Sequence, residues 1–186
     1  AIVGLMITAV VMLFVAPAVK LESPGPLIFK QKRVGKNGRY FYIYKVRSMY
    51  QDAEARKAEL MEKNEMKGFM FKMTDDPRIT KVGKFMRRTS LDELPQLFNI
   101  LKGDISIVGP RPVMEVETEI YGNYRDMLLS VKPGLTGFWA ANGRSCTTYT
   151  RRRAMEICYI KNRSVCFDLK IILKTITSVF KGEGAV

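Results

Sequence analysis

Residues 1–19 read AIVGLMITAVVMLFVAPAV, an uncharged apolar run that is followed at once by Lys20. An α-helix of this length extends about 28 Å at about 1.5 Å per residue, close to the roughly 30 Å hydrocarbon core of a bilayer. A buried core helix or the apolar part of a signal peptide has a similar composition, but no small-residue cleavage site is evident. We therefore predict a membrane-inserted helix over residues 1–19, with Pro17 interrupting its hydrogen bonds only near the end.

Residues 20–186 are predicted to form one further domain. The chain has 186 residues, 47% hydrophobic and 26% charged, which is enough to bury a core and is not a disordered composition. The first residue is Ala1 rather than methionine, and it lies inside the apolar run. We interpret the chain as a piece of a longer protein whose natural N-terminus lies upstream.

Charge and residue usage narrow the classes of function. The net charge of +13 favours anionic partners such as nucleic acid, lipid headgroups or phosphorylated small molecules. The absence of histidine excludes Ser-His-Asp and Cys-His catalytic systems and most zinc sites. An odd number of cysteines without metal-ligand spacing favours a reducing, cytosolic setting over a disulfide framework. These cysteines are Cys146, Cys158 and Cys166.

The pattern of elements predicts an α+β fold that is mostly helical. A basic, glycine-punctuated loop at residues 31–39 precedes the β-rich residues 40–46. Asn37-Gly38 within this loop is a typical turn pair, which favours a small β-hairpin around it. Gly103 is expected to end a helix that runs through Lys102. Residues 67–88 are expected to be irregular. Further helices are predicted over residues 50–66 (a charged surface helix), 114–130, 150–161 and 167–181.

The last predicted helix carries apolar residues at helical spacing, with lysines among them. Two interpretations fit this pattern: an ordinary helix packed on the core, or an amphipathic helix in the plane of a membrane whose lysines contact lipid phosphates. The apolar residues are Leu169, Ile172, Leu173, Ile176, Val179 and Phe180, and the lysines are Lys170, Lys174 and Lys181.

Chemistry is concentrated in the segment RRTSLDELPQLFN at residues 87–99. Ser90 and Glu93 match a capping box, which places Asp92 in the first turn of a helix. In the alternative frame Asp92 is itself the N-cap, and Pro95 then falls at a position where its missing N–H costs little. Both frames predict that Asp92 lies at a helix N-terminus.

A carboxylate at that position suits chemistry on phosphorus. The helix dipole and the free N–H groups favour the ionised carboxylate and attract phosphate, and Arg87 and Arg88 add positive charge. An ionised carboxylate beside a phosphate is placed for nucleophilic attack, with a divalent cation such as Mg²⁺ to relieve the repulsion between the two anions. Acidic residues at a helix start are also ordinary capping, so local physics alone leaves both interpretations open.

The run SLDELPQLFNILKGDISIVGPRP at residues 90–112 closely resembles the bacterial sugar transferase family, the monotopic phosphoglycosyl transferases. The resemblance extends in order over nearly the whole chain. It includes KLESPGPLIFKQ at residues 20–31, Arg33–Gly38, KVRSM at residues 45–49, Asp76-Pro77-Arg78, and KPGLTGFWAANGRS at residues 132–145.

The resemblance implies a two-step, ping-pong reaction. Asp92 would attack the β-phosphorus of a UDP-sugar, releasing UMP and leaving a phosphosugar-aspartyl enzyme. A polyprenyl phosphate, usually undecaprenyl phosphate, would then accept the sugar phosphate. The family's Asp-Glu pair implies that Asp92 and Glu93 are catalytic and lie at a Mg²⁺ site. The implied phosphate contacts are Arg87 and Arg111, followed by Lys45, Arg47, Arg33 and Arg144; Arg111 could instead make a structural tie to a carboxylate, and Lys45, Arg47 and Arg33 could be solvated basic surface.

The resemblance also implies a place in the cell. Its members insert a re-entrant helix into the bacterial cytoplasmic membrane, with a compact catalytic core on the cytosolic face, and they initiate surface glycans such as capsule, O-antigen or exopolysaccharide. The family's helix bends at a Ser-Pro pair, whereas Thr8-Ala9-Val10 holds no proline. Thr8 can still bend a helix by bonding to a backbone carbonyl. A second departure is Ala140, where relatives often carry Gln.

A second hypothesis comes from a different class of protein. The chain could be a basic, membrane-anchored binding or scaffold module for anionic lipid. Nucleic acid is not an expected partner, because the sequence has no helix-turn-helix, RNP-like or zinc pattern and its aromatic residues are not interleaved with the basic runs. The transferred sugar and the oligomeric state, homo-oligomers included, are left open by the sequence.

Overall fold

Helix α1 (Ile2–Glu22) lies along one end of the molecule in this computed structural model, which describes residues 2–65, 71, 73, 75–143 and 148–181. By length and composition α1 is able to cross a membrane. The Thr8 hydroxyl donates to the Gly4 carbonyl oxygen at 2.7 Å, the back-bond expected from the sequence, and the helix continues through Pro17. Apart from Lys20 near its end, the large side chains that α1 exposes are apolar: Ile2, Val3, Met6, Ile7, Val10, Leu13, Phe14 and Leu21.

The predicted hairpin is confirmed. Strands β1 (Ile28–Val34) and β2 (Tyr40–Val46) pair antiparallel around a turn in which Asn37 and Gly38 have positive φ angles of 56° and 74°. Strand β1 is longer than expected, because its second half was predicted as loop. That half pairs with the start of β2, where Arg33 lies opposite Phe41.

A second, parallel sheet joins β3 (Ser106–Val108) to β4 (Gly134–Thr136). A Cβ added to Gly134 would lie 2.1 Å from the Gly109 nitrogen, so the two segments approach as closely as only glycine allows. Helices α7 (Phe138–Ala141), α8 (Tyr149–Asn162) and α9 (Val165–Lys181) surround this sheet. Two clusters of buried apolar residues form the core of this part of the molecule. One consists of Val108, Ala141, Tyr159 and Ile171, and the other of Val113, Tyr121, Leu128 and Ile157.

The last helix packs on the core with part of its surface, and the in-plane membrane interpretation stays a prediction. Helix α9 buries Ile171 in the core, and its lysines Lys170 and Lys174 are exposed. Its other face leaves apolar side chains open to solvent, with Leu169 56% and Leu173 65% exposed. The helix therefore has one packed face and one uncovered apolar face.

Three sequence predictions of secondary structure were wrong. Where a helix was expected over 50–66, the described residues 50–65 form the short helix α2 (Ala55–Glu59) and a 3₁₀ turn, because their charges leave no apolar stripe to bury. The single helix expected over 114–130 is divided into α5 (Glu115–Thr118), a 3₁₀ segment and α6 (Arg125–Leu129), because Gly122 adopts a non-helical φ of 49° and ψ of −126°. Residues 67–88 were expected to be irregular but include most of helix α3 (Lys81–Thr89).

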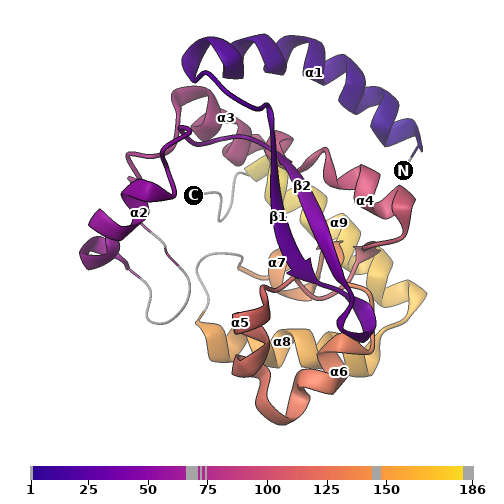
Figure 1. The fold of residues 1–186 in the computed structure, drawn as a ribbon. Helices are drawn as coiled ribbons and strands as arrows, with labels where there is room; N and C mark the ends of the chain where they lie inside the picture. Colours follow the sequence, from indigo (N-terminus) through magenta and orange to yellow (C-terminus); the bar gives the residue numbers. More distant parts are fainter. Residues whose placement is uncertain (1, 66–70, 72, 74, 144–147, 182–186) are drawn as a thin grey trace.

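Helix α3 was missed because its apolar face contacts elements distant in the sequence. Val19 of α1, Val46 of β2 and Met86 of α3 form a common core, and α1 lies directly against α3 and α4 (Figure 1). The backbone of α3 also approaches the Ser48 carbonyl. A Cβ added to Gly83 would lie 2.0 Å from that oxygen.

Gly83→Ala is therefore expected to lower the free energy of unfolding by about 2 kcal/mol, because the added methyl group forces α3 away from Ser48. Urea unfolding of detergent-solubilised protein, followed by circular dichroism, measures the change. The matched control is Lys84→Ala, the next residue of the same helix, whose exposed side chain pairs with exposed Asp75. Equal stability of Gly83→Ala and the control would contradict this packing.

Candidate active site

Asp92 lies in a single 3₁₀ turn, Leu91–Glu93, between two helices. Helix α3 ends at Ser90, whose positive φ of 57° reverses the chain, and α4 (Gln96–Lys102) begins after Pro95. The first frame is right in placing Asp92 in the first turn after Ser90, but that turn is a 3₁₀ turn without a capping box, and the second frame is wrong. Ser90 makes no side-chain capping bond because its left-handed conformation closes α3, and Pro95 rather than Asp92 occupies the N-cap of α4.

Buried contacts hold this turn against the hairpin. Leu91 packs on the core that α1, β2 and α3 share. The fully buried Asn99 side chain accepts from the Tyr44 N–H at 3.2 Å and donates to the Tyr42 carbonyl oxygen at 2.7 Å. Gly103 ends α4 with a φ of 80°, as predicted. Asn99 thus fixes the start of α4 relative to strand β2, which carries Lys45.

Lys45 brings the two predicted catalytic carboxylates together. Its Nζ lies 2.7 Å from Glu93 Oε1 and 3.9 Å from Asp92 Oδ2. Asp92 is only 7% exposed, whereas the Glu93 side chain is 36% exposed. The expected capping box would have turned the Glu93 carboxylate toward the backbone; instead it faces Lys45 and the second carboxylate.

The electrostatics of Asp92 balance burial against two cations. Burial raises the pKa of the Asp92 carboxyl above its ordinary value, Lys45 opposes that rise, neighbouring Glu93 adds to it, and Arg87 opposes it. Lys45 and Arg87 therefore favour the ionised carboxylate that a nucleophile requires.

Arg87 lies beside Asp92, as predicted, and is oriented by a hydroxyl. Its Nε donates to Ser48 Oγ at 3.0 Å, and burial lowers the pKa of its guanidinium while Asp92 and Asp76 oppose that effect. Nearby, Arg78 and Asp76 form a buried ion pair at 2.7 Å. The structure thus gathers Lys45, Arg87, Asp92 and Glu93 in one place.

Arg33 and Arg47 are held by other partners. Arg47 donates to the Pro24 carbonyl oxygen at 2.7 Å and to that of Ser23. Arg33 donates to the Pro112 carbonyl oxygen at 3.1 Å and pairs with Glu117 at 3.2 Å, and burial together with Arg111 lowers its pKa to about 10. Both side chains are buried, so their interpretation as solvated basic surface was wrong.

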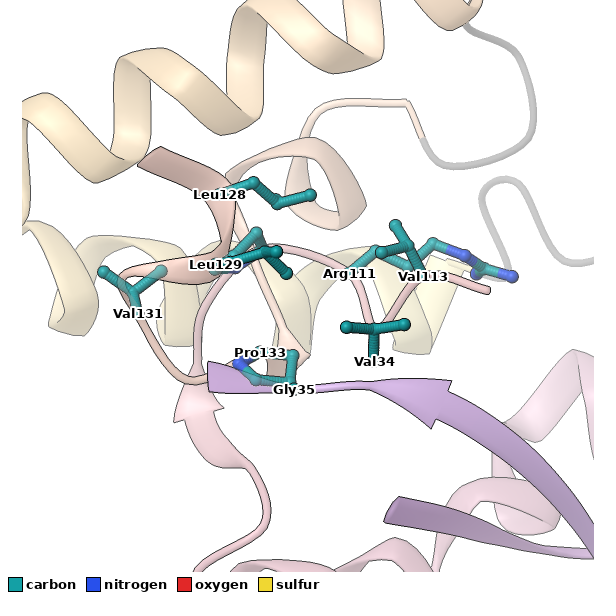
Figure 2. A pocket seen from close by; sticks show the side chains of 9 residues that line it. Val34, Gly35, Arg111, Val113, Leu128, Leu129, Val131 and Pro133 are labelled. Atoms are coloured by element: carbon teal, nitrogen blue, oxygen red, sulfur yellow. The ribbon is translucent and has the colours of Figure 1, made fainter. Parts of the chain in front are cut away.

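Arg111 lies in a second charged cluster. Its guanidinium stands 5.5 Å from the ring centre of Trp139, which Arg152 also approaches at 5.1 Å. The Arg111 backbone N–H donates to Glu156 Oε1 at 3.1 Å; this bond does not use the guanidinium, so it is not the side-chain tie to a carboxylate that was considered from the sequence. Arg111 also lines a small pocket, and Figure 2 shows its guanidinium end directed away from the other lining residues, which are Val34, Gly35, Pro110, Val113, Leu128, Leu129, Val131 and Pro133.

Sequence reasoning missed most of this cluster. Buried Arg152 pairs with Glu117 and Glu156, and the Tyr121 hydroxyl donates to Glu156. The spacing of four residues between Arg152 and Glu156 on α8 was the only local signal. Arg144, the remaining predicted phosphate contact, lies outside the described residues.

The donor set is compatible with Mg²⁺ that substrate helps to coordinate. Among the described residues, no group of three or more His, Cys, Asp or Glu side chains could enclose a metal ion. Asp92 and Glu93 are adjacent carboxylates joined through Lys45. Mg²⁺ is commonly held by one or two carboxylates together with water and substrate phosphate oxygens, so this pair suits it.

Residues 1–182 match the family model described as bacterial sugar transferase. The chain belongs to this family. It is 49% identical to galactosyl transferase CpsE of Streptococcus agalactiae over 186 residues, all of this chain and 41% of that protein. It is 44% identical to the undecaprenyl-phosphate galactose phosphotransferase of Salmonella typhimurium over 165 residues, which are 87% of this chain and 35% of that protein.

A shorter relative in the family is covered more fully. Exopolysaccharide production protein ExoY of Sinorhizobium fredii is 39% identical over 189 residues, which are 100% of this chain and 84% of that protein. The chain thus spans most of ExoY but less than half the length of the other two relatives.

Lys45→Met is expected to raise the pKa of Asp92, because Lys45 is the strongest influence opposing burial. Titration of the ¹³C-labelled aspartate carboxyls by NMR, with Asp92 assigned by substitution, measures the change. Lys30→Met is the matched control, since it removes an exposed lysine from the opposite face of the same hairpin. An Asp92 pKa that is unchanged or lower in Lys45→Met would contradict the role given to Lys45.

Proposed function

We propose that this protein transfers a sugar-1-phosphate from a UDP-sugar to a polyprenyl phosphate, undecaprenyl phosphate in the bacterial cell, and releases UMP. Membership of the sugar transferase family supports this reaction class, as does the name of the Salmonella relative. The observation that carries the proposal is the buried carboxylate of Asp92 between two cations, with Glu93 beside it.

In the first step an Asp92 carboxylate oxygen attacks the β-phosphorus of the donor. The bond from that phosphorus to the bridging oxygen breaks, and UMP leaves with this oxygen. The sugar phosphate is then bound through its phosphorus to the Asp92 carboxylate as an acyl phosphate. Lys45 and Arg87 offset the negative charge that this step brings beside a carboxylate. A bound Mg²⁺ would add charge neutralisation at the phosphate oxygens, and Asp92 and Glu93 are the residues that would hold it.

In the second step a phosphate oxygen of the acceptor attacks the phosphorus held on Asp92. The bond from phosphorus to the carboxylate oxygen breaks, which regenerates Asp92 and gives a lipid-linked diphosphate sugar. Because both steps need the same cations beside the same phosphorus, we assign Lys45, Arg87 and Glu93 to both. Arg111 above Trp139 is the candidate for a more distant contact to the donor diphosphate.

We infer a re-entrant membrane insertion for α1, with the catalytic core on the cytosolic face of the bacterial cytoplasmic membrane. The uncharged run from Ile2 to Val19 and its exposed apolar side chains support the insertion. The uncovered apolar face of α9, flanked by Lys170 and Lys174, supports an interfacial position for that helix. By family resemblance, the product would initiate a surface glycan such as an exopolysaccharide, capsule or O-antigen.

A basic module that binds anionic lipid is the second candidate function. The charge of +13 and the exposed face of α1 support it equally well. One measurement distinguishes the two candidate functions. Detergent-solubilised protein is incubated with a panel of UDP-sugars, Mg²⁺ and polyprenyl phosphate, and the UMP released is assayed. UMP release with one donor supports the transferase and identifies its sugar, whereas a folded protein that releases none from any donor leaves the lipid-binding module.

Asp92→Asn is expected to abolish UMP release, lowering the rate by roughly 10³-fold or more, because an amide cannot form the acyl phosphate. The measurement is the same UMP assay, with circular dichroism to confirm the fold. Exposed Asp126 of α6, changed to Asn, is the control and should release UMP at the wild-type rate. Substantial UMP release by Asp92→Asn would exclude Asp92 as the nucleophile.

Incubation with donor alone is expected to leave the phosphosugar on the enzyme, because no acceptor is present to remove it. Mass spectrometry of the digested protein should then find the added mass on the peptide that contains Asp92. A modified peptide from another part of the chain would require a different nucleophile.

A further inference from the structure

We propose that Glu22 and Arg47 are positioning residues that lock the membrane helix to the catalytic turn and thereby set where Asp92 stands relative to the membrane surface. The inference rests on the proposed function, because it concerns how a lipid-linked acceptor reaches the nucleophile. Glu22 at the end of the membrane helix, the segment 23–25 that follows it and the residues that hold them are called the joint below.

Glu22, the last residue of α1, forms the first part of the joint. Its two carboxylate oxygens accept from the backbone N–H groups of Lys81 at 2.6 Å and Val82 at 2.8 Å. These are the first two residues of α3, and the third, Gly83, donates to the Thr80 hydroxyl. A negative side chain at the positive end of a helix is favourable, so Glu22 fastens one helix to the start of the other.

Arg47 forms the second part. Its guanidinium donates to the carbonyl oxygens of Ser23 and Pro24, which immediately follow α1. Gly25 has a φ of 118°, and a Cβ at that position would lie 2.5 Å from an Arg47 nitrogen. The guanidinium therefore fits closely against the backbone where the chain leaves the membrane helix. Its pocket is built from backbone carbonyls, which suits a structural role better than contact with phosphate.

The joint is connected to the catalytic pair through three consecutive residues, the last two of β2 and Arg47, which follows it. Lys45 contacts Asp92 and Glu93, Val46 packs against Val19 of α1, and Arg47 holds the turn after α1. Helix α3, capped by Glu22 at its start, ends one residue before the turn that carries Asp92. Both routes from the joint to Asp92 are short, and they are anchored by buried Val46 and Met86, so tilting α1 would displace the nucleophile.

The two substrates make different demands on this arrangement. A UDP-sugar is soluble and approaches from water, so its reaction depends on the local geometry of Asp92. A polyprenyl phosphate is anchored in the bilayer, and its phosphate is confined near the membrane surface. Only the second half-reaction therefore requires a fixed height and orientation of Asp92 relative to α1.

The test separates the two half-reactions in Glu22→Ala and Glu22→Gln, with the full chain in lipid nanodiscs. Single-turnover UMP release without acceptor should be unchanged. Transfer from the preformed intermediate to long-chain polyprenyl phosphate should slow on the order of tenfold in Glu22→Ala, as expected for a misplaced reacting group. Glu22→Gln keeps one accepting oxygen and should slow less. Glu119→Gln, at an exposed acid outside the joint, is the control.

A second acceptor distinguishes positioning from general loss of structure. A short-chain, water-soluble polyprenyl phosphate is not held at the membrane, so Glu22→Ala should react with it at nearly the wild-type rate. Equal slowing of both half-reactions, equal slowing with both acceptors, or no slowing at all would overturn the inference. If the wild-type protein released no UMP from any donor, the proposed function would fail, and this inference with it.

Discussion

The ion pair between Lys45 and the adjacent carboxylates of Asp92 and Glu93 is the interaction on which the site depends. Two neighbouring acids, one of them buried, repel each other unless a cation lies between them. The hairpin provides that cation from its second strand, and Asn99 keeps strand and turn in register. The fold can thus be understood as a means of holding one lysine and one carboxylate at a fixed separation.

The features that sequence predicted well are determined by neighbouring residues. The Asn37-Gly38 hairpin turn and the helix end at Gly103 both require positive φ angles, which few residue types adopt. Their positions can therefore be predicted from the residue types at those positions. The family motif indicates Asp92 and Glu93 as the candidate catalytic pair because it is a continuous run, and their catalytic role stays a prediction. The closeness of Arg87 to Asp92 was anticipated from their separation of five residues.

Features that depend on distant partners were not predictable in this way. Arg33 and Arg47 have the residue type and motif of phosphate ligands, yet their partners lie across the fold, at Glu117 and at the turn after α1. The capping box failed because Ser90 could end one helix or begin the next, and packing of Leu91 and Met86 against α1 decided for the first. Local sequence specifies which residues are able to bind, and tertiary contacts decide what they bind.

The burial of Asp92 has a consequence for how economically the enzyme would operate. An acyl phosphate is reactive toward water, and each hydrolysed intermediate would waste a nucleotide-activated sugar. In the proposed reaction, a carboxylate that is 7% exposed would give solvent little access to a phosphorus bound to it. The sheltered turn would therefore let a charged intermediate persist while it awaits a scarce lipid carrier, so that sugar consumption follows the supply of acceptor.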